Sequence, residues 1–344
     1  MECKVEPGGF IVKRSRSTVA WNCVHGGTTV SVVVVLDGSL MISANVGDST
    51  ALCCNVGSQM EPHTLFTTYE PETVHDEASN QGQGTYTVLS AEHSPETPSE
   101  YTRMRQFRPC PHRGANFSEM LFVYDAPSYS KYDCPDVFRV EGSAATPVVT
   151  NNGRYYKSVR NEWATLVTTP PHSRFQDALA FTRSVGDLHL QTYGVTCIPD
   201  VAVLDLQNMF AERNAKGEVD PNSPALLLVC SDGVWDNWKF QDVVRYFATK
   251  ENTVLESGRC PASKNDQNGS GSQSSGGFQY RSADVSSSQG AMHPDGIMQS
   301  TDDVTLGLAT RFMDLNKIEA HKNFGNSADN MTAVVCTIYP MGTK

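Results

Sequence analysis

The strongest constraint on the fold of this chain is a pair of apolar segments joined by Asp37-Gly38. Residues 28–36 (TTVSVVVVL) are rich in β-branched side chains, which favour strands, and residues 39–45 (SLMISAN) follow the dipeptide. An Asp-Gly pair suits the type I′ turn of a tight hairpin. The sequence therefore predicts an antiparallel hairpin over residues 28–45. The nearly unbroken apolar run in its first strand predicts that this strand is covered on both faces.

The rest of the chain predicts more strands than helices. Further strands are expected at four short apolar segments, residues 179–182, 195–206, 225–230 and 332–339. Residues 239–249 and 301–318 carry apolar side chains at the spacing of an amphipathic helix. This mixture predicts an α+β layered domain.

Two polar stretches interrupt this pattern. Residues 108–174 are rich in Pro, Asn, Ser and Tyr, and residues 256–300 are rich in Gly, Ser and Gln. The second composition buries too little apolar area to offset its ordering entropy. We expect one domain over residues 1–344, with a core at about residues 26–339 and with insertions at 108–174 and 256–300.

The charge and composition of the chain exclude several classes of protein. The net charge is −11, and clustered Lys and Arg, which phosphate backbones require, are confined to residues 13–16; no nucleic-acid partner is expected. Apolar runs such as residues 32–36 are too short to span a bilayer. Ten cysteines are present without a C-x-x-C pair, so a reduced compartment is expected and a structural zinc site is not. We expect a monomer in the cytoplasm or nucleus.

Four acidic motifs lie beside predicted strands or turns. They are N-V-G-D-S at residues 45–49, T-R-S-V-G-D at 182–187, S-D-G-V-W-D at 231–236 and S-A-D-N at 327–330. Asp232 directly follows one apolar strand, and Asp329 shortly precedes another. If these strands are antiparallel neighbours, both carboxylates reach one sheet edge, where oxygen ligands suit a hard divalent cation. Each motif alone is more often a simple turn.

The ordered motifs resemble those of the metal-dependent type 2C Ser/Thr protein phosphatases, the PPM family. The resemblance rests on six segments: GGTTVSVVVV, ANVGDST, LSAEHSPETPSEYTRMR, LAFTRSVGD, LLLVCSDGVWDNWKFQDVV and SADNMTAVVCTI. It implies a β-sandwich flanked by helices and Mg²⁺- or Mn²⁺-dependent hydrolysis of phosphoserine and phosphothreonine in phosphoprotein substrates. It implies that Asp232 and Asp329 bind the catalytic metals and that Asp48 and Asp236 help to hold a further metal. Asp187 matches a structural or peripheral position.

The chain departs from the family at its beginning. The family carries an upstream D-G-H-G-G motif, whose aspartate bridges the two metals, and an arginine that contacts the substrate phosphate. Only 25 residues precede Gly26. Residues 23–27 (CVHGG) are the only segment there that resembles D-G-H-G-G, although Gly26 already fits the later strand. We therefore expect an N-terminally incomplete domain and assign no catalytic residue. Three hypotheses stay open: an active phosphatase, a pseudophosphatase that binds or regulates phosphoproteins, and a purely structural domain.

Overall fold

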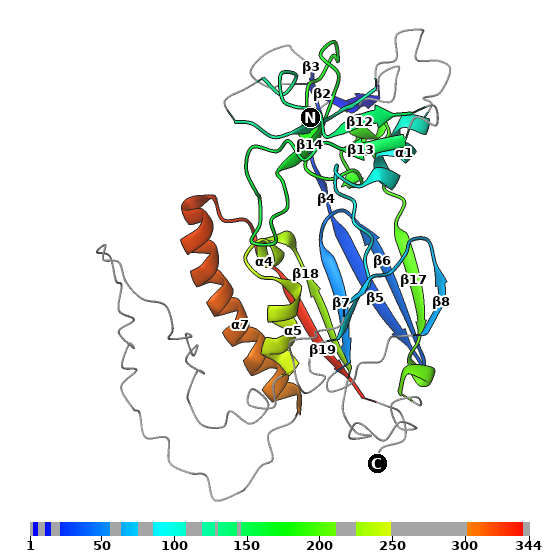
Figure 1. Cartoon of the computed structure of the whole chain (residues 1–344), viewed down its shortest axis with the longest axis vertical. Coiled ribbons are helices and arrows are strands. Elements are labelled where there is room, and N and C mark those ends of the chain that lie inside the picture. Colours follow the sequence, from blue (N-terminus) through cyan, green and yellow to red (C-terminus); the bar gives the residue numbers. More distant parts are fainter. Residues whose placement is uncertain are drawn as a thin grey trace, which may run out of the picture.

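The computed structural model shows a mixed α/β architecture with several sheets and a few helices (Figure 1). It describes residues 3–5, 11–14, 21–55, 63–74, 85–107, 119–127, 130–142, 146–210, 225–248 and 301–339. Among these residues, no helix is long and apolar enough to cross a membrane. The predicted insertion at 256–300 lies outside the described residues.

The larger of the two main sheets contains the predicted C-terminal strands. Its order is β19 (Ala333–Ile338), β18 (Ala225–Cys230), β7 (Thr50–Asn55), β10 (Tyr86–Val88) and β9 (Thr73–Val74). All neighbouring strands in it run antiparallel. β18 is central and buried, whereas β19 is an edge strand on which Val334 is 54% exposed. The prediction of two strands here is confirmed.

The second main sheet begins with the predicted hairpin. Its order is β5 (Val30–Leu36), β6 (Leu40–Val46), β17 (Asp200–Asp205) and β8 (His63–Thr67), again antiparallel. Asp37 and Gly38 both have positive φ, 49° and 61°, as a type I′ turn requires, and the Ser39 N–H donates to Leu36 O at 2.9 Å. The hairpin prediction is confirmed.

The expectation that the first hairpin strand is covered on both faces is wrong. β5 is an edge strand, and Val32 and Val34 are 46% and 42% exposed. Its apolar run reflects the strand propensity of these residues rather than their burial, because β-branched residues favour an extended backbone wherever the strand lies.

Two apolar cores lie on opposite faces of the five-stranded sheet. Leu226 and Leu228 of β18 pack with Trp235 and Phe312 from the helices, whereas Leu227 packs in a cluster that also contains side chains of β6 and β17. This is the alternation expected of a strand buried on both sides. Figure 1 shows the helices α4 (Asp232–Trp235), α5 (Phe240–Ala248) and α7 (Thr301–Phe324) beside this sheet and the other main sheet across from them.

Shorter elements complete the described chain. They are β1 (Cys3–Val5), β2 (Ile11–Arg14), β3 (Trp21–Cys23), β4 (Gly27–Thr28), α1 (Pro98–Gln106), β11 (Leu121–Tyr124), β12 (Phe138–Glu141), β13 (Thr146–Val149), β14 (Thr165–Thr168), β15 (Ala178–Leu179), β16 (Val185–Gly186), α2 (Leu188–Gln191) and η2 (Gly325–Ser327). Four of these strands, β11 to β14, lie within the first predicted insertion, and their apolar side chains share a core with α1 and α2. The predicted strand at 195–206 begins only at Asp200, and the predicted helix at 301–318 continues to Phe324.

Candidate metal centre

The antiparallel pairing of β18 with β19 places two of the acidic motifs side by side. Cys230 pairs with Ala333, so the chain leaves β18 where it enters β19. Ser231 joins the two turns: its N–H donates to Thr332 O at 3.0 Å, and its hydroxyl accepts from the Thr332 N–H at 3.0 Å. The turns that carry Asp232 and Asp329 therefore lie at the same end of this strand pair.

Gly233 permits the close contact between these motifs. A Cβ at this position would lie 2.3 Å from Asn330 O, well inside van der Waals contact. The Gly233 carbonyl accepts hydrogen bonds from the side-chain amides of Asn237 and Asn316 at 3.0 and 3.1 Å. The glycine of S-D-G therefore serves to bring the turn that carries Asp232 against the turn that carries Asp329.

Hydrogen bonds fix the turns that carry Asp48 and Asp236. Asp48 follows Gly47, which has φ 101° and whose N–H donates to His93 Nδ1 at 3.0 Å. The Asp236 N–H donates to Asp232 O at 2.7 Å at the end of α4. Next to it, Trp235 is fully buried and donates to Cys230 O at 2.9 Å, which fixes α4 on the end of β18.

The four aspartates interact electrostatically. Burial and the charges of Asp232 and Asp329 together raise the pKa of Asp48 to about 6, against the opposing charge of Lys157. Burial, and then the charge of Asp329, raise the pKa of Asp232. Burial, with the charges of Asp232 and Glu162, raises the pKa of Asp236 to about 7 against the opposing charge of Lys157. Carboxylates from three separate regions of the chain are thus near enough to affect one another's charge.

Lys157 is a residue of this site that sequence reasoning missed. Burial lowers its pKa, but the charges of Asp48 and Glu162, followed by those of Asp236 and Asp232, outweigh that effect and raise it overall. The segment that carries Lys157 is anchored to α4, because the Val159 N–H donates to Asp236 O at 3.0 Å. No motif signals this lysine, which lies in the first predicted insertion.

More carboxylates extend the acidic site. Burial, followed by the charges of Glu92 and Glu162, raises the pKa of Glu96 to about 7. Burial and Glu162 also raise the pKa of Glu92, against the opposing charges of Lys157 and Arg160. Glu162 forms an ion pair with Arg160, in which Arg160 Nη2 lies 2.9 Å from Glu162 Oε2. The site is therefore strongly acidic, with Lys157 and Arg160 as its nearby cations.

Asp187 has the structural role that the motif comparison implied. Its carboxylate accepts a hydrogen bond from the Ser184 hydroxyl at 2.6 Å, and its N–H donates to Gly26 O at 2.9 Å. Its φ of 42° is left-handed, and the side chain is buried. These contacts hold the turn between β16 and α2.

The donor set of the aspartate cluster suits a hard divalent cation, although no three of these carboxylates have oxygens within 4.8 Å of one another in the structure. Its donors are carboxylate oxygens, which Mg²⁺ and Mn²⁺ prefer. Asp236 Oδ1 is buried and, among the described residues, makes no hydrogen bond, although buried polar atoms are normally paired. A bound cation would satisfy this atom and compensate the mutual repulsion of the carboxylates. Lys157 supplies part of the same compensation.

Comparison with known proteins adds one distant likeness. No protein-family model and no curated protein matches the chain. A solved structure of serine-threonine phosphatase 2C from Toxoplasma gondii is similar, with 13% sequence identity and a TM-score of 0.40 over 90% of this chain and 57% of that chain. The chain thus spans less than two thirds of the length of that phosphatase. A likeness this low carries no argument about function, which must come from the site itself.

Proposed function

We propose that this chain is a divalent-metal-dependent phosphatase domain that acts on phosphoserine and phosphothreonine in proteins. The observation that carries the proposal is the contact between two acidic motifs: Ser231 is hydrogen-bonded to Thr332, and Gly233 lies against Asn330 O. Four aspartates from three motifs, Asp48, Asp232 with Asp236, and Asp329, are near enough there to affect one another's charge. We assign these four aspartates as ligands of Mg²⁺ or Mn²⁺. The sandwich arrangement of the two main sheets belongs to the same proposal.

The residues of the site would have different roles in such a reaction. Bound divalent cations would supply an activated water and neutralise the charge of a phosphate group. Asp232 begins α4 directly after β18, in a turn that Ser231 ties to Thr332, and this fixed position suits it to hold a cation. Asp329 is exposed, so a phosphorylated side chain on a protein surface reaches this edge without entering a deep cavity. Lys157 lies where its ammonium group can bind a phosphate oxygen once cations neutralise the aspartates.

One observation favours a second candidate, a pseudophosphatase that binds phosphoproteins without turnover. The Lys157 ammonium group interacts with Asp48, Asp232 and Asp236, and it therefore partly neutralises the cluster without a metal. A cation that binds there has to compete with this internal positive charge. In this candidate, Lys157 replaces part of the metal complement and the acidic edge recruits or regulates a partner.

Two variants separate these candidates. The full chain is assayed with Mn²⁺ on p-nitrophenyl phosphate and on a phosphothreonine peptide, beside Asp232→Asn and the control Asp314→Asn, whose carboxylate is exposed on α7. The enzyme proposal predicts Mn²⁺-dependent turnover that Asp232→Asn abolishes and Asp314→Asn preserves.

The pseudophosphatase candidate predicts a different pair of results. The chain shows no turnover at any Mn²⁺ concentration, and Lys157→Gln increases Mn²⁺ affinity without restoring turnover. Metal-independent turnover that Asp232→Asn leaves unchanged would contradict both candidates.

A further inference from the structure

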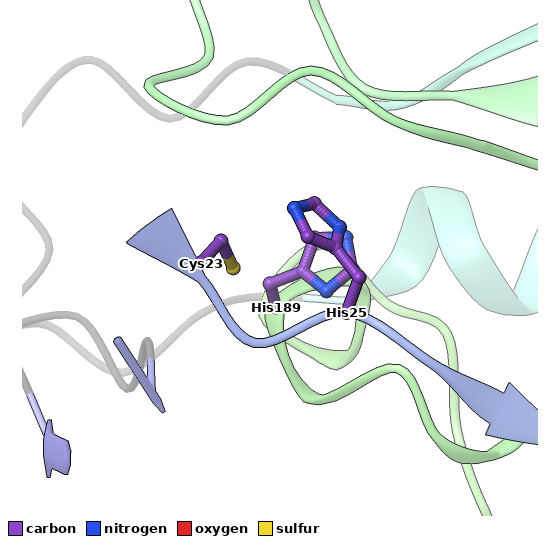
Figure 2. A group of neighbouring side chains, drawn as sticks. All are labelled: Cys23, His25 and His189. Carbon is purple, nitrogen blue, oxygen red and sulfur yellow. The ribbon is translucent and has the colours of Figure 1, made fainter. Parts of the chain in front are cut away.

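A second group of ligand-type side chains lies outside the acidic site. Cys23 Sγ and one nitrogen each of His25 and His189 all lie within 4.8 Å of one another. Figure 2 shows Cys23 and His25 close together along one segment, with the ring of His189 reaching toward them from another. The two imidazole rings meet edge to face, with their centroids 4.6 Å apart.

Strand pairing explains how residues so distant in sequence meet. Gly27 pairs with Gly186 where β4 meets β16, and the Asp187 N–H donates to Gly26 O at 2.9 Å. This pairing places the start of α2, with His189, beside the segment that joins β3 to β4. A Cβ at Gly186 would lie 2.7 Å from Gly26 O, so the close approach depends on glycine.

Asp177 orients both imidazoles in the manner of a metal site. Its Oδ2 lies 2.7 Å from His189 Nε2 and 2.9 Å from His25 Nδ1. Burial raises the pKa of Asp177, but the hydrogen bonds from His25, Ala178 and His189 outweigh this and hold it below its usual value. An ionised carboxylate only accepts, so each ring nitrogen that faces it carries the hydrogen. In the neutral rings, His189 Nδ1 and His25 Nε2 then keep a lone pair.

His189 Nδ1 is the atom that most directly indicates a missing ligand. His189 is 1% exposed, and its Nδ1 makes no hydrogen bond among the described residues. Leaving such an atom unpaired costs about 1–3 kcal/mol. The buried thiol of Cys23 makes only a weak contact, 3.7 Å from Val24 O, and forms no disulfide with any cysteine of the described ranges. A thiolate and two imidazoles are the ligands that zinc prefers.

A comparable group elsewhere in the chain lacks this signature. His93, Glu100 and Asp200 also lie within 4.8 Å of one another. There, both nitrogens of His93 are bonded, to the Gly47 N–H and to Asp200. Arg183 neutralises the two carboxylates, at 2.6 Å from Glu100 and 2.8 Å from Asp200. That group is a satisfied ion-pair network with no vacant donor.

We propose that Cys23, His25 and His189 bind one Zn²⁺ ion, with Asp177 as the hydrogen-bonding partner of both imidazoles. Zinc–ligand bonds of about 2.0–2.3 Å place tetrahedral ligand atoms about 3.5 Å apart, so shifts of about 1 Å close the group on the ion. Binding replaces the proton of the Cys23 thiol, which passes to solvent. The ion joins the end of β3 to α2 and so holds the small sheet β1-β2-β3 on the rest of the chain.

Zinc titration of the full chain tests this site. The chain, freed of metal, is titrated with Zn²⁺ in excess Mg²⁺, and binding is followed by calorimetry, by metal analysis after dialysis and by the thermal unfolding midpoint. We expect one equivalent of tightly bound Zn²⁺ and a higher unfolding midpoint. Co²⁺ in place of Zn²⁺ should show thiolate charge-transfer absorption, which Cys23→Ser removes.

Matched variants assign the ion to this site. Cys23→Ser and His25→Asn should each lower Zn²⁺ affinity at least tenfold, and Asp177→Asn by about 10–100-fold. His25 is half exposed, with a side chain 49% accessible, so its variant is expected to fold. Cys336→Ser, an exposed thiol on β19, and Asp232→Asn in the acidic site should bind Zn²⁺ as the wild type does. Absence of tight Zn²⁺ binding by the wild type, unchanged binding by His25→Asn, or loss of binding in Asp232→Asn would overturn the proposal. None of these results depends on phosphatase activity.

Discussion

Replacing Gly233 by alanine should disturb the acidic site and the stability of the chain together. The new Cβ would lie 2.3 Å from Asn330 O, and the two turns must separate by about 1 Å to reach ordinary contact. The neighbour is a backbone carbonyl, which cannot rotate away, and it also accepts a hydrogen bond from the Ser231 hydroxyl at 3.2 Å. Overpacking of this kind costs about 1–3 kcal/mol.

The effect is measured by thermal and urea unfolding, with Mn²⁺ affinity determined on the same samples. In a domain of this size, 1 kcal/mol lowers the unfolding midpoint by about 2–4 °C. We also expect Mn²⁺ affinity to fall at least tenfold, because the shift separates Asp232 from Asp329. The matched control is Gly307→Ala in α7, where a Cβ meets nothing within 4 Å and better helix propensity adds up to about 1 kcal/mol. Equal stability and equal Mn²⁺ affinity in the two variants would refute this account of the S-D-G glycine.

Two further predictions concern stability. Burial raises the pKa of Glu100, but hydrogen bonds from Arg183 and Arg103 outweigh this effect and lower the pKa to about 2. Because the pKa is depressed in the folded state, this carboxylate contributes about 3 kcal/mol of stability above pH 4.5. That contribution is lost as the pH falls toward 2. Urea unfolding from pH 7 downward should show this loss. Glu100→Gln should remove it while costing about 1–3 kcal/mol at pH 7, because Arg183 keeps only Asp200 as its carboxylate partner. An unchanged acid limb in the variant would contradict this prediction. Leu228→Ala in the buried strand should cost about 2–5 kcal/mol, whereas Val34→Thr on the exposed edge strand should change stability by less than about 0.5 kcal/mol. Similar losses in both variants would show that the edge strand is covered in solution.

Local chemistry explains which parts of the fold the sequence predicted. Asp37-Gly38 and the β-branched run before it determine a hairpin through turn geometry and strand propensity, which act over a few residues. The exposure of that strand was mispredicted, because burial depends on which strand or helix lies beyond it. The strands of residues 119–174 were missed for a related reason: they are short and bury their apolar side chains against α1 and α2, so they show no long periodic pattern.

The same distinction holds for the sites. The turns of Asp232 and Asp329 could be placed side by side from sequence because each lies within a few residues of an apolar strand and the two strands pair antiparallel. Lys157 could not be predicted from sequence as part of this site, because its proximity to the aspartates arises from the hydrogen bond that anchors Val159 to Asp236 at the end of α4. The cluster of Cys23 with His189 depends on pairing between β4 and β16. The absence of a C-x-x-C pair excludes only zinc sites built from neighbouring cysteines.

Titration of the full chain with Mn²⁺ tests the central claim, that the acidic sheet edge is a divalent-metal site, most directly. Calorimetry is performed with the Cys23 site saturated by Zn²⁺, on the wild type, Asp232→Asn and the control Asp314→Asn. The account predicts saturable Mn²⁺ binding by the wild type and by Asp314→Asn, and an affinity at least tenfold lower for Asp232→Asn. Absence of Mn²⁺ binding by the wild type, or equal affinity in all three proteins, would contradict it.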